Sequence, residues 1–199
     1  MFSARPHRKF IVAFAVAATL ALVSAAAPED PDAGSTAIPN RKVADMLFEL
    51  ALANRKVYTR DIVQRLASGD GAITASEHYL DQRGLPLPAQ VFRLSAEELL
   101  GSTDDFWLQL RALDPINFAN GPITPVEEEG LQFVAENPEQ PFYAEERGLA
   151  GRPSLVAVYA DVANVEACVT CHNSHPKSPR RDFKLGDVMG GIIVRVFLD

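Results

Sequence analysis

The segment ACVTCHNSHP, residues 167–176, contains the only two cysteines of the chain, Cys168 and Cys171, and a histidine follows the second one directly. The segments on either side of it, residues 154–162 and 188–197, are rich in β-branched residues and are typical of strands. A motif held between two strands is expected to project from an edge of their sheet. The motif therefore constrains the fold as well as the chemistry.

Helices are predicted upstream of these strands. Apolar side chains recur at helical spacing over residues 41–68, which predicts one long helix that Gly69 ends. Shorter helices are expected at residues 74–82, at the capping box of Ser95 and Glu98, at residues 103–113, and from Thr124 and Pro125 to Asn137. A weak strand at residues 141–145 is joined to the strand at 154–162 by a glycine-containing turn. Helices first and antiparallel strands last predict an α+β fold.

The N-terminus is typical of a targeting segment. Arg5, Arg8 and Lys9 precede an apolar run at residues 10–23, and small residues then offer a cleavage site after Ala25 or Ala26. The apolar stretch 10–27 is also about long enough to remain as a membrane anchor. We therefore expect export to the periplasm, with residues 1–25 as signal peptide or signal anchor, 26–40 as flexible linker and 41–199 as a single domain.

Composition excludes one large class of partner. The chain has 26 Asp and Glu residues against 19 Lys and Arg, and its formal net charge is −7. A nucleic-acid binder needs a basic surface to meet the phosphates. We expect no nucleic-acid partner, and a membrane contact only if the N-terminal segment is uncleaved.

The motif C-x-x-C-H is the attachment signature of c-type haem. Two thiols three residues apart can each bond one of the two vinyl groups of the porphyrin, and the histidine that follows is delivered to the iron as proximal ligand. The sequence thus predicts one covalent haem on Cys168 and Cys171, with His172 as the proximal iron ligand.

Three other chemistries compete for the same residues. A zinc site would crowd Cys168, Cys171, His172 and His175 into eight residues, whereas zinc sites usually take their second ligand pair from another element. A thioredoxin-like redox pair expects a βαβ setting, which the predicted elements lack. A disulfide suits an oxidising compartment, but so short a bridge stabilises little. Haem is the favoured interpretation, because the chain is predicted to be exported and has no other cysteine.

The C-terminal sixty residues resemble the single-haem, PAS-like sensory domain family that is named after a cyanobacterial c-type cytochrome. The resemblance rests on a strand followed by CxxCHN-x-HP-x-SP, then DFK-x-GDVMGG and a closing strand. In this chain these motifs are residues 168–173, 175–176, 178–179, 182–184 and 186–191. It is looser over residues 41–139. It implies a PAS-like antiparallel sheet with a long N-terminal helix and a CxxCH haem loop, one covalent haem, export, and redox or small-ligand sensing.

The ligand on the other side of the iron is less constrained. His78, in the predicted helix 74–82, is the best candidate for a distal ligand, while Met46 and Met189 are expected to pack in the core. Members of the resembling family vary in this ligand, and some offer an upstream cysteine, which this chain lacks. An open sixth site stays an alternative.

Polar residues after the motif are candidates for the haem propionates. His175 should lie on the same side of the ring as His172, so a hydrogen bond to a propionate suits it better than ligation. Arg180, Arg181 and Lys184, with Lys177, form a basic cluster that would neutralise the propionates or dock an acidic partner. The pair Gly190 and Gly191 in the last strand indicates either the close approach of another body, such as a haem face, or a bulge.

These expectations combine into a redox or small-ligand sensor, with the long helix at 41–68 facing a separate redox or signalling protein. Its ligand would be CO, NO or another small molecule. The alternative is a soluble periplasmic electron-transfer cytochrome. Enzymatic activity is not expected, because the sequence shows no distal His-Arg pair of the kind that supports a haem peroxidase.

Overall fold

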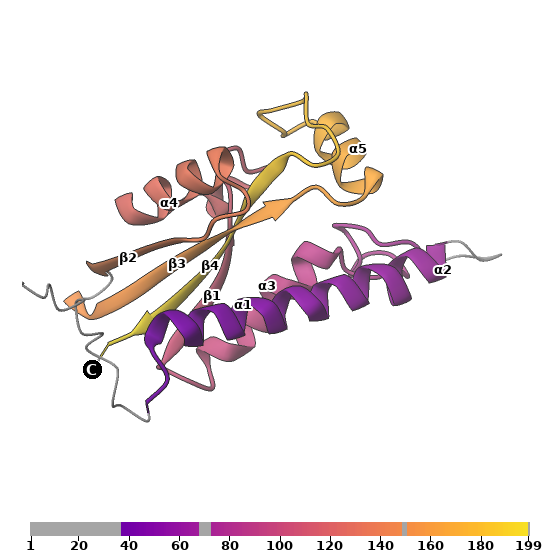
Figure 1. Cartoon of the computed structure of the whole chain (residues 1–199). Coiled ribbons are helices and arrows are strands. Elements are labelled where there is room, and N and C mark those ends of the chain that lie inside the picture. Colours follow the sequence, from indigo (N-terminus) through magenta and orange to yellow (C-terminus); the bar gives the residue numbers. More distant parts are fainter. Residues whose placement is uncertain (1–36, 68–72, 149–150, 199) are drawn as a thin grey trace, which may run out of the picture. The chain divides into compact units, whose positions relative to one another are not determined.

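The computed structural model describes residues 37–67, 73–148 and 151–198, and it has a four-stranded antiparallel sheet with helices on both faces (Figure 1). The strand order is β1-β4-β3-β2. The strands are β1 (Phe106–Arg111), β2 (Phe142–Arg147), β3 (Pro153–Val162) and β4 (Val188–Phe197). The predicted α+β fold, with an antiparallel sheet and a long N-terminal helix, is confirmed.

The long predicted helix is present but is not uniform. It consists of α1 (Asn40–Val57), the π-helix η1 (Tyr58–Gln64) and α2 (Arg65–Ala67) in direct succession. The other helices are α3 (Pro88–Leu100), the 3₁₀ turn η2 (Phe118–Asn120), α4 (Pro125–Glu136) and α5 (Glu166–Ser174). Thr124 caps α4 as predicted, because its Oγ1 accepts a hydrogen bond from the Glu127 N–H at 3.2 Å.

The prediction of a helix over residues 103–113 is wrong, because this segment contains β1. Phe106 and Leu108 alternate with residues that point to the other face, and Phe106 pairs with Val196 of β4. Over so short an apolar run, helical and strand spacing cannot be told apart from sequence. The capping box of Ser95 and Glu98 is also wrong: it lies inside α3, which begins at Pro88.

Residues 74–82 form turns rather than the predicted helix. Ala75 and Leu85 make an isolated parallel bridge, supported by hydrogen bonds from Leu85 N to Thr74 O and from Ser76 N to Leu85 O. The backbone thus closes on itself across this segment and does not continue a helical ladder. His78 therefore lies in a loop, residues 73–87, that we call the bridge loop.

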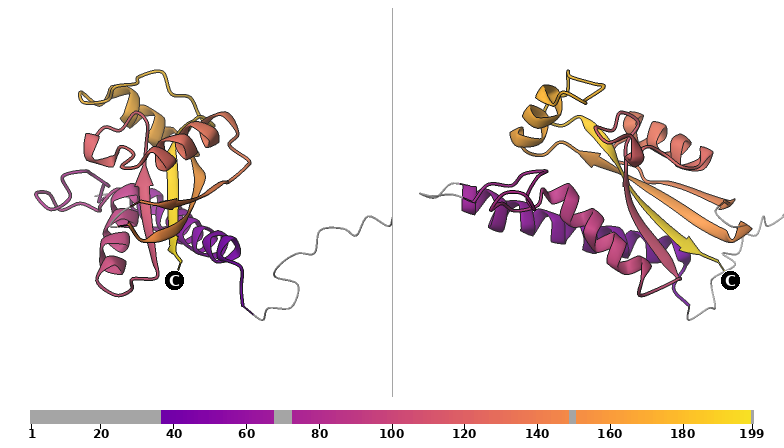
Figure 2. Two further views of the ribbon diagram at one scale, coloured as in Figure 1. Left: turned by 90° about the vertical axis from the view of Figure 1, so that its left-hand side faces the viewer. Right: turned by 180° about the vertical axis from the view of Figure 1, so that it is seen from behind.

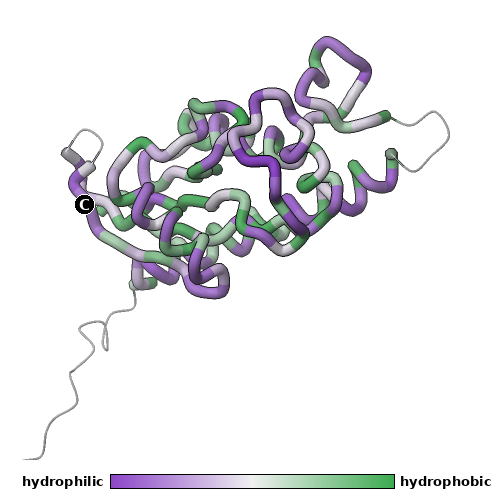
Figure 3. Tube along the Cα trace, turned by 90° about the horizontal axis from the view of Figure 1, so that it is seen from above, coloured by the Kyte–Doolittle hydropathy of each residue, from purple (hydrophilic) through white to green (hydrophobic). Residues whose placement is uncertain are grey.

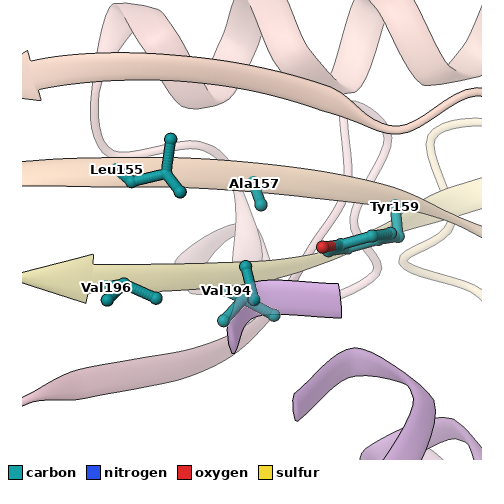
Figure 4. Packing of buried hydrophobic residues seen from close by; sticks show 6 residues of the cluster. Leu155, Ala157, Tyr159, Val194 and Val196 are labelled. Carbon is teal, nitrogen blue, oxygen red and sulfur yellow. The ribbon is translucent and has the colours of Figure 1, made fainter. Parts of the chain in front are cut away.

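The sheet separates two cores. Helices α1 and α3 lie on one face and α4 on the other (Figure 2). Because side chains alternate along a strand, Leu155, Ala157, Tyr159, Val194 and Val196 face α1, as Figure 4 shows. Val156, Val158 and Ile193 face the α4 side. The inner strands β3 and β4 are nearly continuous apolar runs, which fits a sheet buried on both faces. Figure 3 shows hydrophobic and hydrophilic segments interspersed along the described trace.

A buried cation joins three strands to α4. Arg195 of β4 is 1% exposed and donates to Glu127 of α4 at 2.9 Å and to Ser154 of β3 at 2.8 Å. It also forms an ion pair with Glu146 of β2. Because Glu127 is fully buried, its carboxylate needs this partner to offset the cost of leaving water.

Helix α1 is fixed to the sheet by a shared acceptor. Asp45 Oδ1 accepts hydrogen bonds from the hydroxyls of Tyr143 and Tyr159, and the Phe48 ring stacks on the Tyr159 ring with centroids 4.0 Å apart. Burial raises the pKa of Tyr159, and the hydrogen bond to Asp45 raises it further. The tyrosine thus stays neutral and remains a donor.

The close approach expected at Gly190 and Gly191 is made by protein atoms. A Cβ on Gly190 would lie 2.5 Å from the Arg111 carbonyl oxygen, and one on Gly191 would lie 2.7 Å from a Leu131 methyl carbon. The β3–β4 register also shifts at Asp161 and Val162. Close backbone packing beside a bulge therefore accounts for the pair.

The predicted signal segment, residues 1–25, and most of the predicted linker lie outside the described residues. From residue 37 onward, the described chain belongs to one compact unit, Thr36–Asp199. None of its described helices has the length and apolar character needed to cross a bilayer.

Replacing Arg195 tests the buried ion pairs. We expect Arg195→Ala to reduce the free energy of unfolding by about 3–5 kcal/mol, because it leaves the buried Glu127 carboxylate without a counter-charge. Urea denaturation followed by circular dichroism measures this. Arg93→Ala, which removes an exposed pair with Glu97 on α3, is the control and should change stability by less than about 1 kcal/mol. Equal losses in the two variants would contradict the argument.

Candidate functional site

The cysteine motif lies on α5, in the connection between β3 and β4. These are the two inner strands, so the motif projects from the end of the sheet's centre and not from a lateral edge strand. The Ala163 N–H donates to Asp187 O at 2.8 Å, and the Gly186 N–H donates to Ala163 O at 2.9 Å. These two bonds close the base of the connection and fix the direction in which α5 leaves the sheet.

Helical geometry brings the three motif side chains together. Cys168, Cys171 and His172 are at positions i, i+3 and i+4 of α5, which lie on one face of a helix. Both cysteines are free thiols, Cys168 half-buried and Cys171 exposed. Burial raises the pKa of each thiol, and Glu77 raises that of Cys171 further, so both are held in the protonated form.

His172 is held from one side by an aromatic ring. Its imidazole meets the Phe183 ring edge to face, with centroids 5.7 Å apart. Burial lowers the pKa of His172, and His175 adds to this while Asp161 opposes it. The neutral imidazole, which is the form that binds metals, is therefore favoured.

A buried nitrogen of the same ring is unsatisfied. His172 Nδ1 has no hydrogen-bond partner among the described residues. Buried polar atoms are normally paired, so a ring nitrogen without a partner needs an explanation such as a bound group. Two adjacent free thiols and such an imidazole fit covalent haem attachment with histidine ligation.

Asn173 anchors α5 to the chain that follows it. Its amide oxygen accepts from the Phe183 N–H at 3.0 Å, and its amide nitrogen donates to the Phe183 carbonyl at 2.9 Å. Phe183 also packs with Ala163, Val169 and Met189. The predicted packing role of Met189 is confirmed, and the Phe183 ring that meets His172 is held in place from two sides.

The end of α1 approaches the motif through an ion pair that the sequence did not reveal. Arg55 Nη1 lies 2.6 Å from Asp161 Oδ1 at the end of β3, and both side chains are mostly buried. Arg55 lowers the pKa of Cys168, opposing the larger effect of burial. The long helix and the cysteine motif are thus electrostatically coupled.

The bridge loop contacts the C-terminal end of α5. Glu77 Oε1 lies 3.1 Å from His175 Nε2, and His175 Nδ1 accepts from the Lys177 N–H at 3.1 Å. His78 follows Glu77 directly, but 64% of its side chain is exposed. The structure brings the loop that carries His78 to the motif, and the distal role of His78 stays a prediction. Met46 is 52% exposed, so its predicted core position is wrong.

The arginines of the basic cluster after the motif form contacts within their own loop. Arg180 pairs with Asp182 at 2.8 Å and Asp187 at 3.4 Å, and lies over the Phe183 ring. Arg181 donates to the Pro176 and Ser178 carbonyls. The predicted propionate contacts of Arg180, Arg181, Lys184 and His175 stay predictions, but the first two guanidiniums and the imidazole already have protein partners.

The zinc interpretation finds no support in the described part of the chain. No group of three or more His, Cys, Asp or Glu side chains converges there in a way that could hold a metal ion. Since a structural zinc site needs four converging ligands, His175 does not complete a set with the three motif residues.

Comparisons with known proteins add a family and a fold. The family model described as Tll0287-like matches residues 38–196. Among solved structures, the crystal structure of the cyanobacterial haem protein Tll0287 matches with a TM-score of 0.52 and 14% identity, over 81% of this chain and 98% of that chain. None of the curated proteins compared matches significantly. At this identity the structural match establishes the fold alone.

Replacing Asn173 tests the anchoring of α5. We expect Asn173→Ala to reduce the free energy of unfolding by about 1–3 kcal/mol and to speed amide exchange around Phe183, because two backbone groups lose their partner. Hydrogen–deuterium exchange with mass spectrometry measures this. Ser174→Ala removes an exposed side-chain bond one residue away and is the matched control. Unchanged exchange at Phe183 in Asn173→Ala would show that the amide does not hold the segment.

Proposed function

The chain belongs to the Tll0287-like family, as its C-terminal motif predicted, and on that premise we propose that it is an exported haem protein: a c-type cytochrome with one covalent haem on Cys168 and Cys171 and His172 as proximal ligand. The observation that carries the proposal is the shared face of α5, where two free thiols lie beside an imidazole with an unpartnered buried nitrogen.

Cys168 and Cys171 would hold the haem through two thioether bonds, each equivalent to addition of one S–H across one vinyl C=C of the porphyrin with no leaving group. The bound haem supplies one-electron redox chemistry and a site for a small ligand. The chain's own residues orient it, since Phe183 and Asn173 fix the His172 ring and the helix that carries it.

We further propose a redox or small-ligand sensing role. The Arg55–Asp161 pair supports it, because it connects the long helix to the strand end from which the motif departs. The Glu77–His175 contact does the same for the bridge loop. A change in charge or ligation at the haem would act on both contacts, and the response would pass to a separate redox or signalling protein.

Covalent attachment is tested with the two cysteines. The chain is expressed with its N-terminal segment in a host that carries c-type maturation machinery, and haem is measured as the alkaline pyridine spectrum after acid-acetone extraction. We expect a c-type band in the wild type and in the control Ser174→Ala, and none in Cys168→Ala/Cys171→Ala. A band that survives extraction in the double variant would refute the proposal.

Ligation is tested separately from attachment. His172→Ala should keep the pyridine band but change the absorption spectrum of the folded protein, because the thioethers remain while the proximal bond is lost. His78→Ala should change the same spectrum if the bridge loop supplies the distal ligand. A His172→Ala spectrum identical to that of the wild type would assign the proximal ligand elsewhere.

Sensing is tested by comparing oxidation and ligand states. A sensor should change coordination on reduction or on binding CO or NO, visible in absorption and resonance Raman spectra. It should also show altered amide exchange in the α1 segment around Arg55. An electron carrier should keep two strong axial ligands in both oxidation states and exchange electrons rapidly. Unchanged axial ligation with rapid electron exchange would overturn the sensing role and leave the haem assignment intact.

A further inference from the structure

The outer face of the long helix carries apolar side chains that are about half exposed or more in the described part of the chain. Leu50 is 62% exposed, Met46 52% and Val57 48%, and the exposed Ala53 lies between them. We call these four residues the outer stripe. Soluble monomers rarely leave so many neighbouring apolar residues on one helix in water, so the stripe indicates an interaction surface.

The π-helix extends the stripe. Ile62 follows Val57 by five residues and Leu66 follows Ile62 by four, and both are about 40% exposed. A π-helical turn takes in an extra residue, so the five-residue step across η1 keeps these side chains on the face of the outer stripe. The α-helical part of this face, residues 46–57, is about 17 Å long at about 1.5 Å per residue.

The spacing of the outer stripe is that of a helix pair. Residues 46, 50, 53 and 57 are separated by four, three and four positions, the a/d pattern of a coiled-coil contact. Such a stripe is narrow, whereas a helix that lies on a membrane surface needs a broad apolar face. The opposite face of α1 is already packed on the sheet through Ala44. The geometry therefore favours another helix as the occupant.

The two charged residues beside the outer stripe have opposite signs, so they can pair with each other across a two-fold axis. Glu49 and Lys56 lie one heptad apart on the same edge, both exposed, and neither forms an ion pair within the described part of the chain. In an antiparallel pair of α1 helices, residues on the same edge face each other. Glu49 then meets Lys56 of the second copy, twice by symmetry, while Met46 faces Val57 and Leu50 faces Ala53.

From these observations we propose that the protein forms a two-fold symmetric dimer through antiparallel packing of α1 on α1 of a second copy. The contact is self-complementary, as a two-fold interface requires. Its core of four apolar layers is small, so we expect a reversible dimer and not a permanent one. The proposal is independent of haem attachment, because none of its residues belongs to the motif.

Sedimentation velocity of the purified exported protein over a concentration series tests it. The wild type should show a monomer–dimer equilibrium. Leu50→Glu should weaken association at least about 100-fold, because the two-fold axis buries the new charge twice. Phe118→Glu, at a 91% exposed position on η2, is the matched control and should associate like the wild type. Circular dichroism confirms that each variant is folded.

A charge exchange tests the antiparallel arrangement. Glu49→Lys should weaken the dimer, because it meets Lys56 of the second copy, and adding Lys56→Glu to the same chain should restore it. A double variant no stronger than the single one would overturn the arrangement.

A wild type that stays monomeric at every concentration would overturn the dimer. A second result would also overturn the dimer: the monomer binds vesicles of equal parts phosphatidylcholine and phosphatidylglycerol, and Leu50→Glu abolishes that binding. The stripe would then be a membrane contact.

Discussion

The pairing of β3 with β4 is the interaction on which the rest of the molecule depends. These strands form the middle of the sheet over a long antiparallel register, and their alternate side chains supply both cores. The same two strands hold the ends of the connection that carries α5. A loss of register between them would turn apolar residues toward the wrong face and would misplace the motif in the same step.

Polar contacts fix the positions of helices on the sheet, which apolar packing alone leaves free to shift. Helix packing against a sheet is tolerant of small shifts, but a hydrogen bond or ion pair between buried groups is lost when the elements slide. Arg195 sets α4 against three strands, and Asp45 sets α1 against the two tyrosines of β2 and β3. Because α1 is fixed near its start, the position of Arg55 near its end is determined as well, and with it the contact to Asp161.

The sequence contained enough to predict the fold class, the long helix, α4, β3 and β4, because each has strong periodicity or a clear cap. The pattern over β2 was weaker, and it was predicted only as a weak strand. Sequence reasoning misassigned β1 and the bridge loop, where short apolar runs fit two periods and the deciding partners are distant in sequence. The three motif residues were identifiable by their spacing. Arg55, Asp161, Glu77 and Phe183 were not, since only the tertiary fold brings them to α5.

The long helix connects the two surfaces for which we propose functions. Arg55 faces Asp161 and the motif, while Leu50 and Val57, within one and a half turns of it, point outward. In a rigid helix a rotation that breaks the Arg55–Asp161 pair also turns the outer stripe. In the proposed dimer, antiparallel packing would bring the Arg55 regions of two copies near the same axis. A haem state that shifted the dimerisation free energy would, by reciprocity, itself be shifted by dimerisation to the same extent.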